Sequence, residues 1–172
     1  MARNWSIIEA HCNHQEAFTP RFQGSYDAMK SEFTHNLDDY RLRNTILDYH
    51  QHSRYHIKLA NIMHSHNQSQ ACLILCDWAL ASMVKALYIQ EYHVVHPPKE
   101  LTMNEILHIV HTDTEPGLDI AMFIGTIQHR SSIEEFNHDR NLQPNNIEKL
   151  LQRTQEILEE LENQLKNDIE IK

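Results

Sequence analysis

The sequence predicts an all-α protein, a bundle of about five helices with an up-and-down core. Glycine and proline are scarce, with 3 and 5 residues among 172, so the chain lacks the turn residues that repeated β-hairpins require. From about Leu42 onward, apolar residues recur at steps of three and four, which is the spacing of one helical face. The stretch 71–92 is apolar on nearly all sides, which is typical of a helix surrounded by others.

The domain organisation follows from length and from a change in pattern. A chain of 172 residues can bury one hydrophobic core but is short for two domains. Residues 1–41 are polar and weakly periodic, and we expect them to form a helical or irregular extension packed on the bundle. The helical bundle is expected over 42–167, followed by a short tail at 168–172.

Local signals place the ends of several helices. The residues 67–69, Asn-Gln-Ser, mark a turn before the apolar core helix. Pro97-Pro98 forbids a continuous helix there, and Thr102 with Glu105 forms a capping-box pattern that opens a short helix. A fourth helix is expected over 118–136, and the last begins near Pro144, because proline is well tolerated at a helix start.

The charge balance argues against strong binding to nucleic acid. The formal net charge is -9, and no cluster of Lys and Arg is visible in the sequence. Tight binding to the phosphate backbone needs such a cluster. The 14 histidines would reduce the net negative charge as the pH falls toward their ordinary pKa.

The sequence also predicts a soluble, cytoplasmic protein. No basic segment followed by an apolar run opens the chain, so we expect no export signal. The longest apolar run is interrupted by Asp77, Ser82 and Lys85, so a buried core helix is favoured over a membrane span. Three cysteines cannot pair evenly, and Cys72 and Cys76 lie one helical turn apart inside that run, which fits a reducing compartment.

The order of elements and one short motif resemble a known superfamily. The motif is the stretch 78–88, WALASMVKALY, followed by Pro97-Pro98 and then by Ile106-Leu107. It resembles the second helix, the proline-bearing connection and the next helix of HEPN proteins (higher-eukaryote-and-prokaryote nucleotide-binding domains). The resemblance covers about residues 42–167. It implies a HEPN-like bundle that acts on or binds nucleotides, forms a homodimer, or pairs with a nucleotidyltransferase-like protein.

The chain departs from the HEPN pattern where catalysis would need it. Ala81 and Thr102 stand where the family often has Glu and His, which weakens the case for nucleotide handling. Ribonucleases of the family often use an Arg and a His with four to six residues between them, Arg to hold a phosphate and His to move a proton. Arg130 and His138 are the weak catalytic candidates here, but they are spaced more widely. Arg43 and His50 match the count but lie in the first bundle helix.

Asp77 and Lys85 are the candidate ligand-binding residues. Their spacing places them on similar sides of a helix about 12 Å apart, too far for a direct ion pair. In the simpler interpretation one lies on an outward seam and the other extends to the surface. In the functional interpretation both line a ligand groove. Trp78, Tyr88 and Tyr92 are expected in the core or at a dimer face rather than on a base-stacking platform.

A histidine-ligated metal site is a further alternative. His52 and His56 lie one helical turn apart and, with His111, are the weak candidate ligands. Close histidine pairs only slightly exceed what chance gives for 14 histidines in 172 residues. We therefore expect no cofactor and no metal.

Together these patterns favour a non-catalytic HEPN-like binding or interaction module, for a nucleotide or for a nucleotidyltransferase-type partner. Two alternatives stay open, a HEPN-type ribonuclease and a metal-binding helical bundle. A ribonuclease would need an Arg and a His that face one phosphate. A metal site would need about three histidines that converge on one point.

Folding should require no metal, because a closed site needs about four organised ligands and the histidine pairs do not supply them. The thermal midpoint should be the same before and after dialysis against a chelator. One tightly held zinc or iron per chain, whose removal unfolds the protein, would contradict this.

Overall fold

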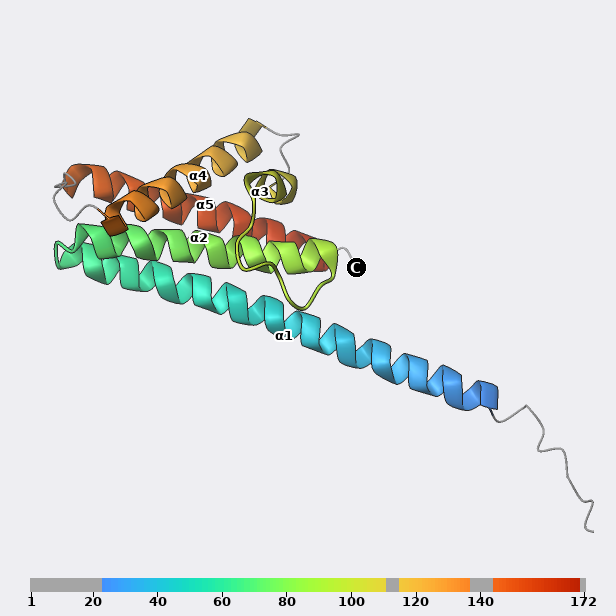
Figure 1. The fold of residues 1–172 in the computed structure, drawn as a ribbon. Helices are drawn as coiled ribbons and strands as arrows, with labels where there is room; N and C mark the ends of the chain where they lie inside the picture. The colour runs from blue at the N-terminus through green and yellow to red at the C-terminus, as the bar shows by residue number, and fades with distance from the viewer. Residues whose placement is uncertain (1–22, 111–114, 137–143, 171–172) are drawn as a thin grey trace, which may run out of the picture. The chain divides into compact units, whose positions relative to one another are not determined.

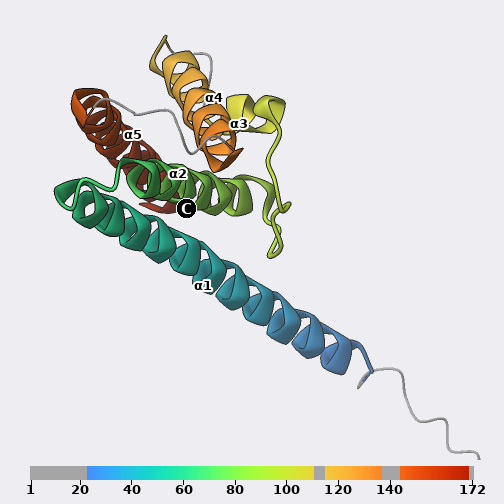
Figure 2. The same cartoon turned by 60° about the vertical axis from the view of Figure 1, so that its left-hand side comes forward.

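The computed structural model describes residues 23–110, 115–136 and 144–170, with side chains placed for 37–110, 117–132 and 146–166. The regular structure in these ranges is helical and includes no strand, which confirms the all-α prediction. The described helices, drawn in Figures 1 and 2, are α1 (Gln23–Ser65), α2 (Ser69–Tyr92), α3 (Met103–Ile109), α4 (Glu115–Phe136) and α5 (Pro144–Glu170).

The chain divides into two units, Met1–Leu37 and Asp38–Lys172. Helix α1 begins at Gln23, well before the expected start of the first bundle helix near Leu42. The polar residues before Leu42 therefore continue this helix toward the N-terminus. Packing of the N-terminal extension on the bundle stays a prediction.

The turn between α1 and α2 is closed by backbone hydrogen bonds. Asn67 has a left-handed conformation, with φ 56°. The amide of Gln68 donates to the carbonyl of Met63 at 2.9 Å, and the amide of Asn67 donates to that of His64 at 2.9 Å. This is the Schellman arrangement, in which asparagine tolerates the left-handed position better than most residues. The predicted turn is confirmed. After it, α2 runs back alongside residues 38–65 of α1 (Figures 1 and 2).

Helix α2 is the core of the second unit. α5 packs along it, α4 crosses it, and α3 lies against both α2 and α4 (Figures 1 and 2). Each large apolar side chain that α2 buries stabilises the fold by about 1.5–3 kcal/mol relative to an exposed one. The buried residues of α2 are Cys72, Leu73, Cys76, Ala79, Leu80, Met83, Val84, Ala86, Leu87 and Ile89.

The helices that cover α2 contribute one apolar face each. Helix α4 starts three residues earlier than expected, at Glu115, because Pro116 falls in its first turn, where its missing N–H costs nothing. Helix α5 begins at Pro144 as predicted. Thr154 interrupts the apolar stripe of α5 and is fully buried. Its hydroxyl is nevertheless satisfied, because it donates a hydrogen bond to the carbonyl of Leu150 at 2.7 Å. The buried apolar residues of the two helices are Ile120, Ala121, Ile124, Ile127, Ile147, Leu151, Ile157, Leu158, Leu161 and Leu165.

The capping box predicted at α3 is present. The backbone amide of Thr102 donates to Oε2 of Glu105 at 2.7 Å, and the amide of Glu105 donates to the Thr102 hydroxyl at 3.3 Å. These bonds satisfy two amides at the start of the helix. The backbone amide and then the hydroxyl of Thr102 lower the pKa of Glu105. The box fixes the start of α3, which carries Ile106 into the core.

Helix α1 meets the other helices through a seam that is partly polar. Nε2 of His50 lies 3.5 Å from Oε1 of Glu162 on α5. The side-chain amide of Gln155 on α5 donates to Oδ1 of Asn61 at 3.1 Å. Ser53 is fully buried, and its hydroxyl has no hydrogen-bond partner among the described residues. This seam is therefore less apolar than the contact between α2 and α5.

Within the described ranges, α2 is the one helix long and apolar enough to cross a membrane. In the bundle, 56% of this stretch is buried by the neighbouring helices. Its apolar character is thus accounted for by its position in the core.

Acid should destabilise the bundle through His56. Burial and then the neighbouring His52 lower the pKa of His56 below its ordinary 6.5. The unfolded chain therefore binds this proton more readily, so the contribution of neutral His56 to stability is lost as the pH falls below about 6.5.

The measurement is urea unfolding at about pH 7.5 and about pH 5.5, on either side of the histidine range. His56→Gln should lose less stability on acidification than the wild type. His129→Gln, a change at an exposed position of α4, is the matched control. Equal acid sensitivity of wild type and His56→Gln would contradict the prediction.

Candidate functional site

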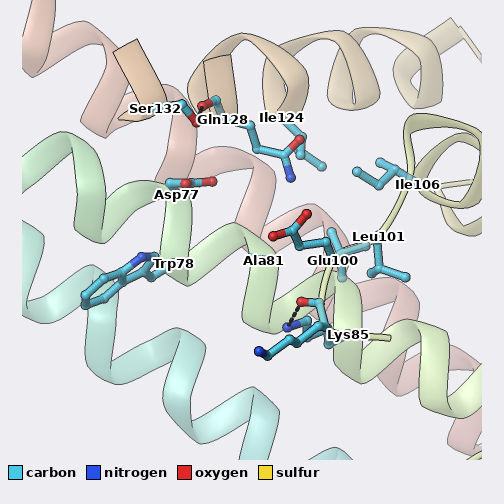
Figure 3. Close-up of a pocket in the computed structure, with 12 residues that line it drawn as sticks. Asp77, Trp78, Ala81, Lys85, Glu100, Leu101, Ile106, Ile124, Gln128 and Ser132 are labelled. Carbon is cyan, nitrogen blue, oxygen red and sulfur yellow. Dashed lines mark hydrogen bonds between the residues drawn. The ribbon is translucent and has the colours of Figure 1, made fainter. Parts of the chain in front are cut away.

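A cavity of about 510 Å³ lies between α2, the segment 99–101, α3 and α4 (Figure 3). Its wall combines charged, amide, hydroxyl, aromatic and aliphatic side chains. Clefts of this size can hold a small organic ligand, with a few polar groups fixing its orientation. The lining residues are Asp77, Trp78, Ala81, Val84, Lys85, Lys99, Glu100, Leu101, Ile106, Ile124, Gln128 and Ser132.

Helix α2 supplies the floor of the cavity. The lining residues that it contributes are separated by intervals of one, three and four residues, so they share one helical face. Ala81 lies between the polar ends of this face, where its short side chain leaves room.

Asp77 is held by a hydrogen bond from α4. The Ser131 hydroxyl lies 2.7 Å from Oδ2 of Asp77 and 3.0 Å from the carbonyl of Gln128. The hydroxyl has one proton, and we assign it to Asp77 because that contact is shorter and the acceptor is a carboxylate. Ser131 is buried, so this bond joins α2 to α4 inside the bundle. The carboxylate of Asp77 is thereby fixed at one end of the cavity.

Lys85 connects α2 to the segment after the prolines. Its Nζ donates to the backbone carbonyl of Lys99 at 2.8 Å (Figure 3). A lysine ammonium has three N–H groups, so donors remain for other acceptors. Lys99 is also among the residues that line this end of the cavity. Lys85 therefore positions the segment that forms one wall and contributes positive charge beside it.

Trp78 was expected in the core or at a dimer face, and the core is excluded because 52% of its surface is exposed, while a place at a dimer face stays a prediction. Its ring lies edge-on to His56 of α1, with 5.7 Å between centroids. Trp78 is also among the residues that line the cavity. Tyr92 is 44% exposed, and Tyr88, half-buried, packs against it with ring centroids 4.5 Å apart. Helix α2 is apolar around its whole circumference, so its pattern could not reveal which aromatic residue would reach the surface.

The structure brings together the two predicted ligand-binding residues. Asp77 and Lys85 both line the cavity, although each uses a different hydrogen-bond partner. Ligand binding by this pair stays a prediction. Glu100 and Gln128, which come from other segments of the chain, also line the cavity and were not predicted from the sequence. No motif surrounds either residue, so only the folded arrangement could reveal them.

The metal candidates are only partly described. The rings of His52 and His56 stack with centroids 6.4 Å apart, and His111 lies outside the described residues. Among the residues whose positions are given, no group of three His, Cys, Asp or Glu side chains is placed to hold a metal ion.

Of the two catalytic candidates, the structure describes only one. Arg130 is exposed on α4, and His138 lies outside the described residues. In the other Arg–His spacing, Arg43 is exposed while His50 turns toward Glu162 of α5. This places the His50 ring in the seam between α1 and α5.

The cysteines of α2 are free thiols buried in the core. A hydrogen bond with the Cys72 thiol and burial together raise the pKa of Cys76. The thiolate is the reactive form of cysteine, so Cys76 is a poor nucleophile. This agrees with the predicted role of both residues as small core side chains.

Two adjacent serines provide a test of the Asp77 contact. Ser131→Ala should lower the free energy of unfolding by about 1.5–3 kcal/mol, because it removes a buried hydrogen bond to a charged group. Ser132→Ala should change it by less than about 0.5 kcal/mol, because Ser132 is exposed and its hydroxyl donates to a carbonyl of its own helix. Urea unfolding measures both, and equal effects would contradict the assignment.

Comparison with protein-family models, with curated proteins and with solved structures finds no significant match to this chain. The HEPN resemblance therefore rests on the motif at residues 78–88 and the segments that follow it.

Proposed function

We propose that this protein is a non-catalytic, HEPN-like binding module whose cavity holds a nucleotide. The observation that carries the proposal is the composition of one ligand-sized cavity. The residues that line it include a tryptophan, two lysines, two acidic residues and a glutamine. A nucleotide needs each of these contacts, for its base, its phosphate and its polar base edge.

The phosphate would lie beside Lys85 and Lys99. Phosphate oxygens form strong, charge-assisted hydrogen bonds with ammonium groups. Lys85 keeps N–H groups available beyond the one that it donates to the carbonyl of Lys99. Lys99 lines the same wall and carries a second positive charge.

The base would stack on Trp78. Base–aromatic stacking is worth about 1–3 kcal/mol per base, and the indole of Trp78 is exposed enough to offer a face. Trp78 and Lys85 are two helical turns apart, about 10 Å along α2. A ribose between the base and the phosphate would bridge this separation above Ala81.

In this proposal the cavity binds the nucleotide and does not catalyse a reaction on it. None of the twelve residues that line the cavity is a histidine or a cysteine. Asp77 is held by Ser131, a contact that supports a structural role for its carboxylate. As part of the same proposal, the HEPN resemblance favours a cytoplasmic homodimer with a nucleotidyltransferase-type partner.

Trp78 provides the readout for nucleotide binding. Trp5 and Trp78 are the two tryptophans of the chain, so Trp5→Phe leaves Trp78 as the single indole fluorophore. Nucleoside monophosphates should quench it saturably. Lys99→Ser should weaken binding of a nucleoside monophosphate about tenfold or more, because a charge-assisted contact is lost, and weaken the nucleoside less.

Lys58→Ser is the matched control, because Lys58 is exposed on α1 and does not line the cavity. Absence of quenching by any nucleotide would contradict the proposal. RNA cleavage that Arg130→Ala or His138→Ala abolishes, with an unchanged helical spectrum, would instead favour a ribonuclease.

A further inference from the structure

Residues 38–65 of α1 carry a second apolar face, away from the core. Its large side chains are exposed: Tyr40 by 64%, Leu47 by 51%, Tyr55 by 59% and Ile62 by 48%. They follow one another at intervals of seven, eight and seven residues, so they lie along one side of the helix. We call these four residues the α1 stripe. Exposed apolar patches of this kind mark surfaces that bind a partner.

The buried face of α1 lies on the other side of the helix. Ile46, Ser53 and Ala60 are buried and recur every seven residues. At 3.6 residues per turn, the α1 stripe lies about 160° round the helix from them. Both views show α2, α4 and α5 on one side of residues 38–65 (Figures 1 and 2). The α1 stripe therefore has no part in the core that these helices form.

The α1 stripe is symmetric in sequence about Gln51, which is exposed on the same side of the helix. Leu47 and Tyr55 each lie four residues from Gln51, and Tyr40 and Ile62 each lie eleven residues from it. The pattern of exposed apolar residues is thus the same in either chain direction. A surface with this property is complementary to an antiparallel copy of itself.

We propose that α1 pairs with α1 of a second copy of this chain, antiparallel, about a two-fold axis at Gln51. Leu47 then lies against the partner's Tyr55, and Tyr40 lies against the partner's Ile62. A two-fold interface requires this reciprocity, because each contact occurs twice. The inference goes beyond the proposed function, which includes a homodimer but neither its surface nor its orientation.

The polar residues between the apolar ones select the antiparallel orientation. Asn44 and Lys58 are exposed on the same side of α1, and each lies seven residues from Gln51. An antiparallel pair places Lys58 against the partner's Asn44, whose carbonyl oxygen accepts a hydrogen bond from the ammonium group. A parallel pair places the two Lys58 side chains against each other, and their charges repel. Polar residues in a helix–helix seam fix register and orientation in this way.

The length of the α1 stripe indicates a moderate affinity. From Tyr40 to Ile62 the helix rises by about 33 Å. A single pair of helices of this length is at the lower end of specific interfaces, roughly 1,200 Å² in total. We therefore expect a dimer with a dissociation constant in the micromolar range.

Sedimentation equilibrium of the full chain, from about 1 to about 200 µM, measures the pairing. The wild type should change from monomer to dimer in this range. Leu47→Glu should weaken the dimer at least about tenfold, because it buries a carboxylate against the partner's Tyr55 at two places. Leu118→Glu is the matched control, since Leu118 is 53% exposed on α4 and should leave the dissociation constant unchanged.

Substitutions at Asn44 test the orientation. Asn44→Glu should tighten the dimer about threefold or more, because each new carboxylate faces the partner's Lys58. Asn44→Lys should weaken it, and adding Lys58→Glu to Asn44→Lys should restore it. Asn163→Glu, at an exposed position of α5, adds the same charge and should not tighten the dimer. A parallel pair gives the opposite sign, since Asn44→Glu then faces itself.

A protein that stays monomeric at about 200 µM would overturn the inference. A dimer that Leu47→Glu and Leu118→Glu weaken equally, or one that Asn44→Glu weakens, would overturn it as well. The α1 stripe and the cavity share no residue, so Leu47→Glu should bind nucleotides as the wild type does. A dimer with the expected variants but without nucleotide binding would support this inference and contradict the proposed nucleotide site.

Discussion

The burial of α2 is the constraint on which the rest of the structure depends. Leu80 and Ala79 are fully buried, and Met83 is nearly so. A helix this apolar is stable in water only when other helices cover it. The described parts of α1, α3, α4 and α5 are arranged to provide that cover. The cavity lies along the face of α2 that includes Ala81 and the exposed Trp78, where the cover is incomplete.

The two charged residues that α2 places along the cavity, Asp77 and Lys85, are a second constraint on the fold. Burying a charged group costs free energy unless it is hydrogen-bonded. Asp77 meets this requirement through Ser131 of α4, and Lys85 meets it through the carbonyl of Lys99. Each contact also attaches a separate part of the chain to α2. The two bonds that make these residues tolerable in the bundle thus also hold two walls of the cavity in place.

The sequence was sufficient for the features that depend on neighbouring residues. The capping box at Thr102, the turn at Asn67 and the helix start at Pro144 each need only local chemistry, and each was predicted. The early start of α1 was missed because its first residues lack the apolar periodicity that the core side of a helix imposes. Asp77 and Lys85 were recognisable because charges stand out in an apolar helix. Glu100 and Gln128 were not, since only tertiary structure brings them together.

The partly polar seam of α1 has a consequence for how the bundle opens. Local unfolding requires least free energy where few apolar contacts are lost, and such segments open before the global transition. The described core face of α1 buries Ser53 and faces His50 toward Glu162, whereas α2 and α5 meet through aliphatic side chains. We therefore expect residues 38–65 of α1 to separate from α2 before the other helices do in a sub-global opening. Because Trp78 rests on His56 of α1, that opening would free the indole from its only described ring contact.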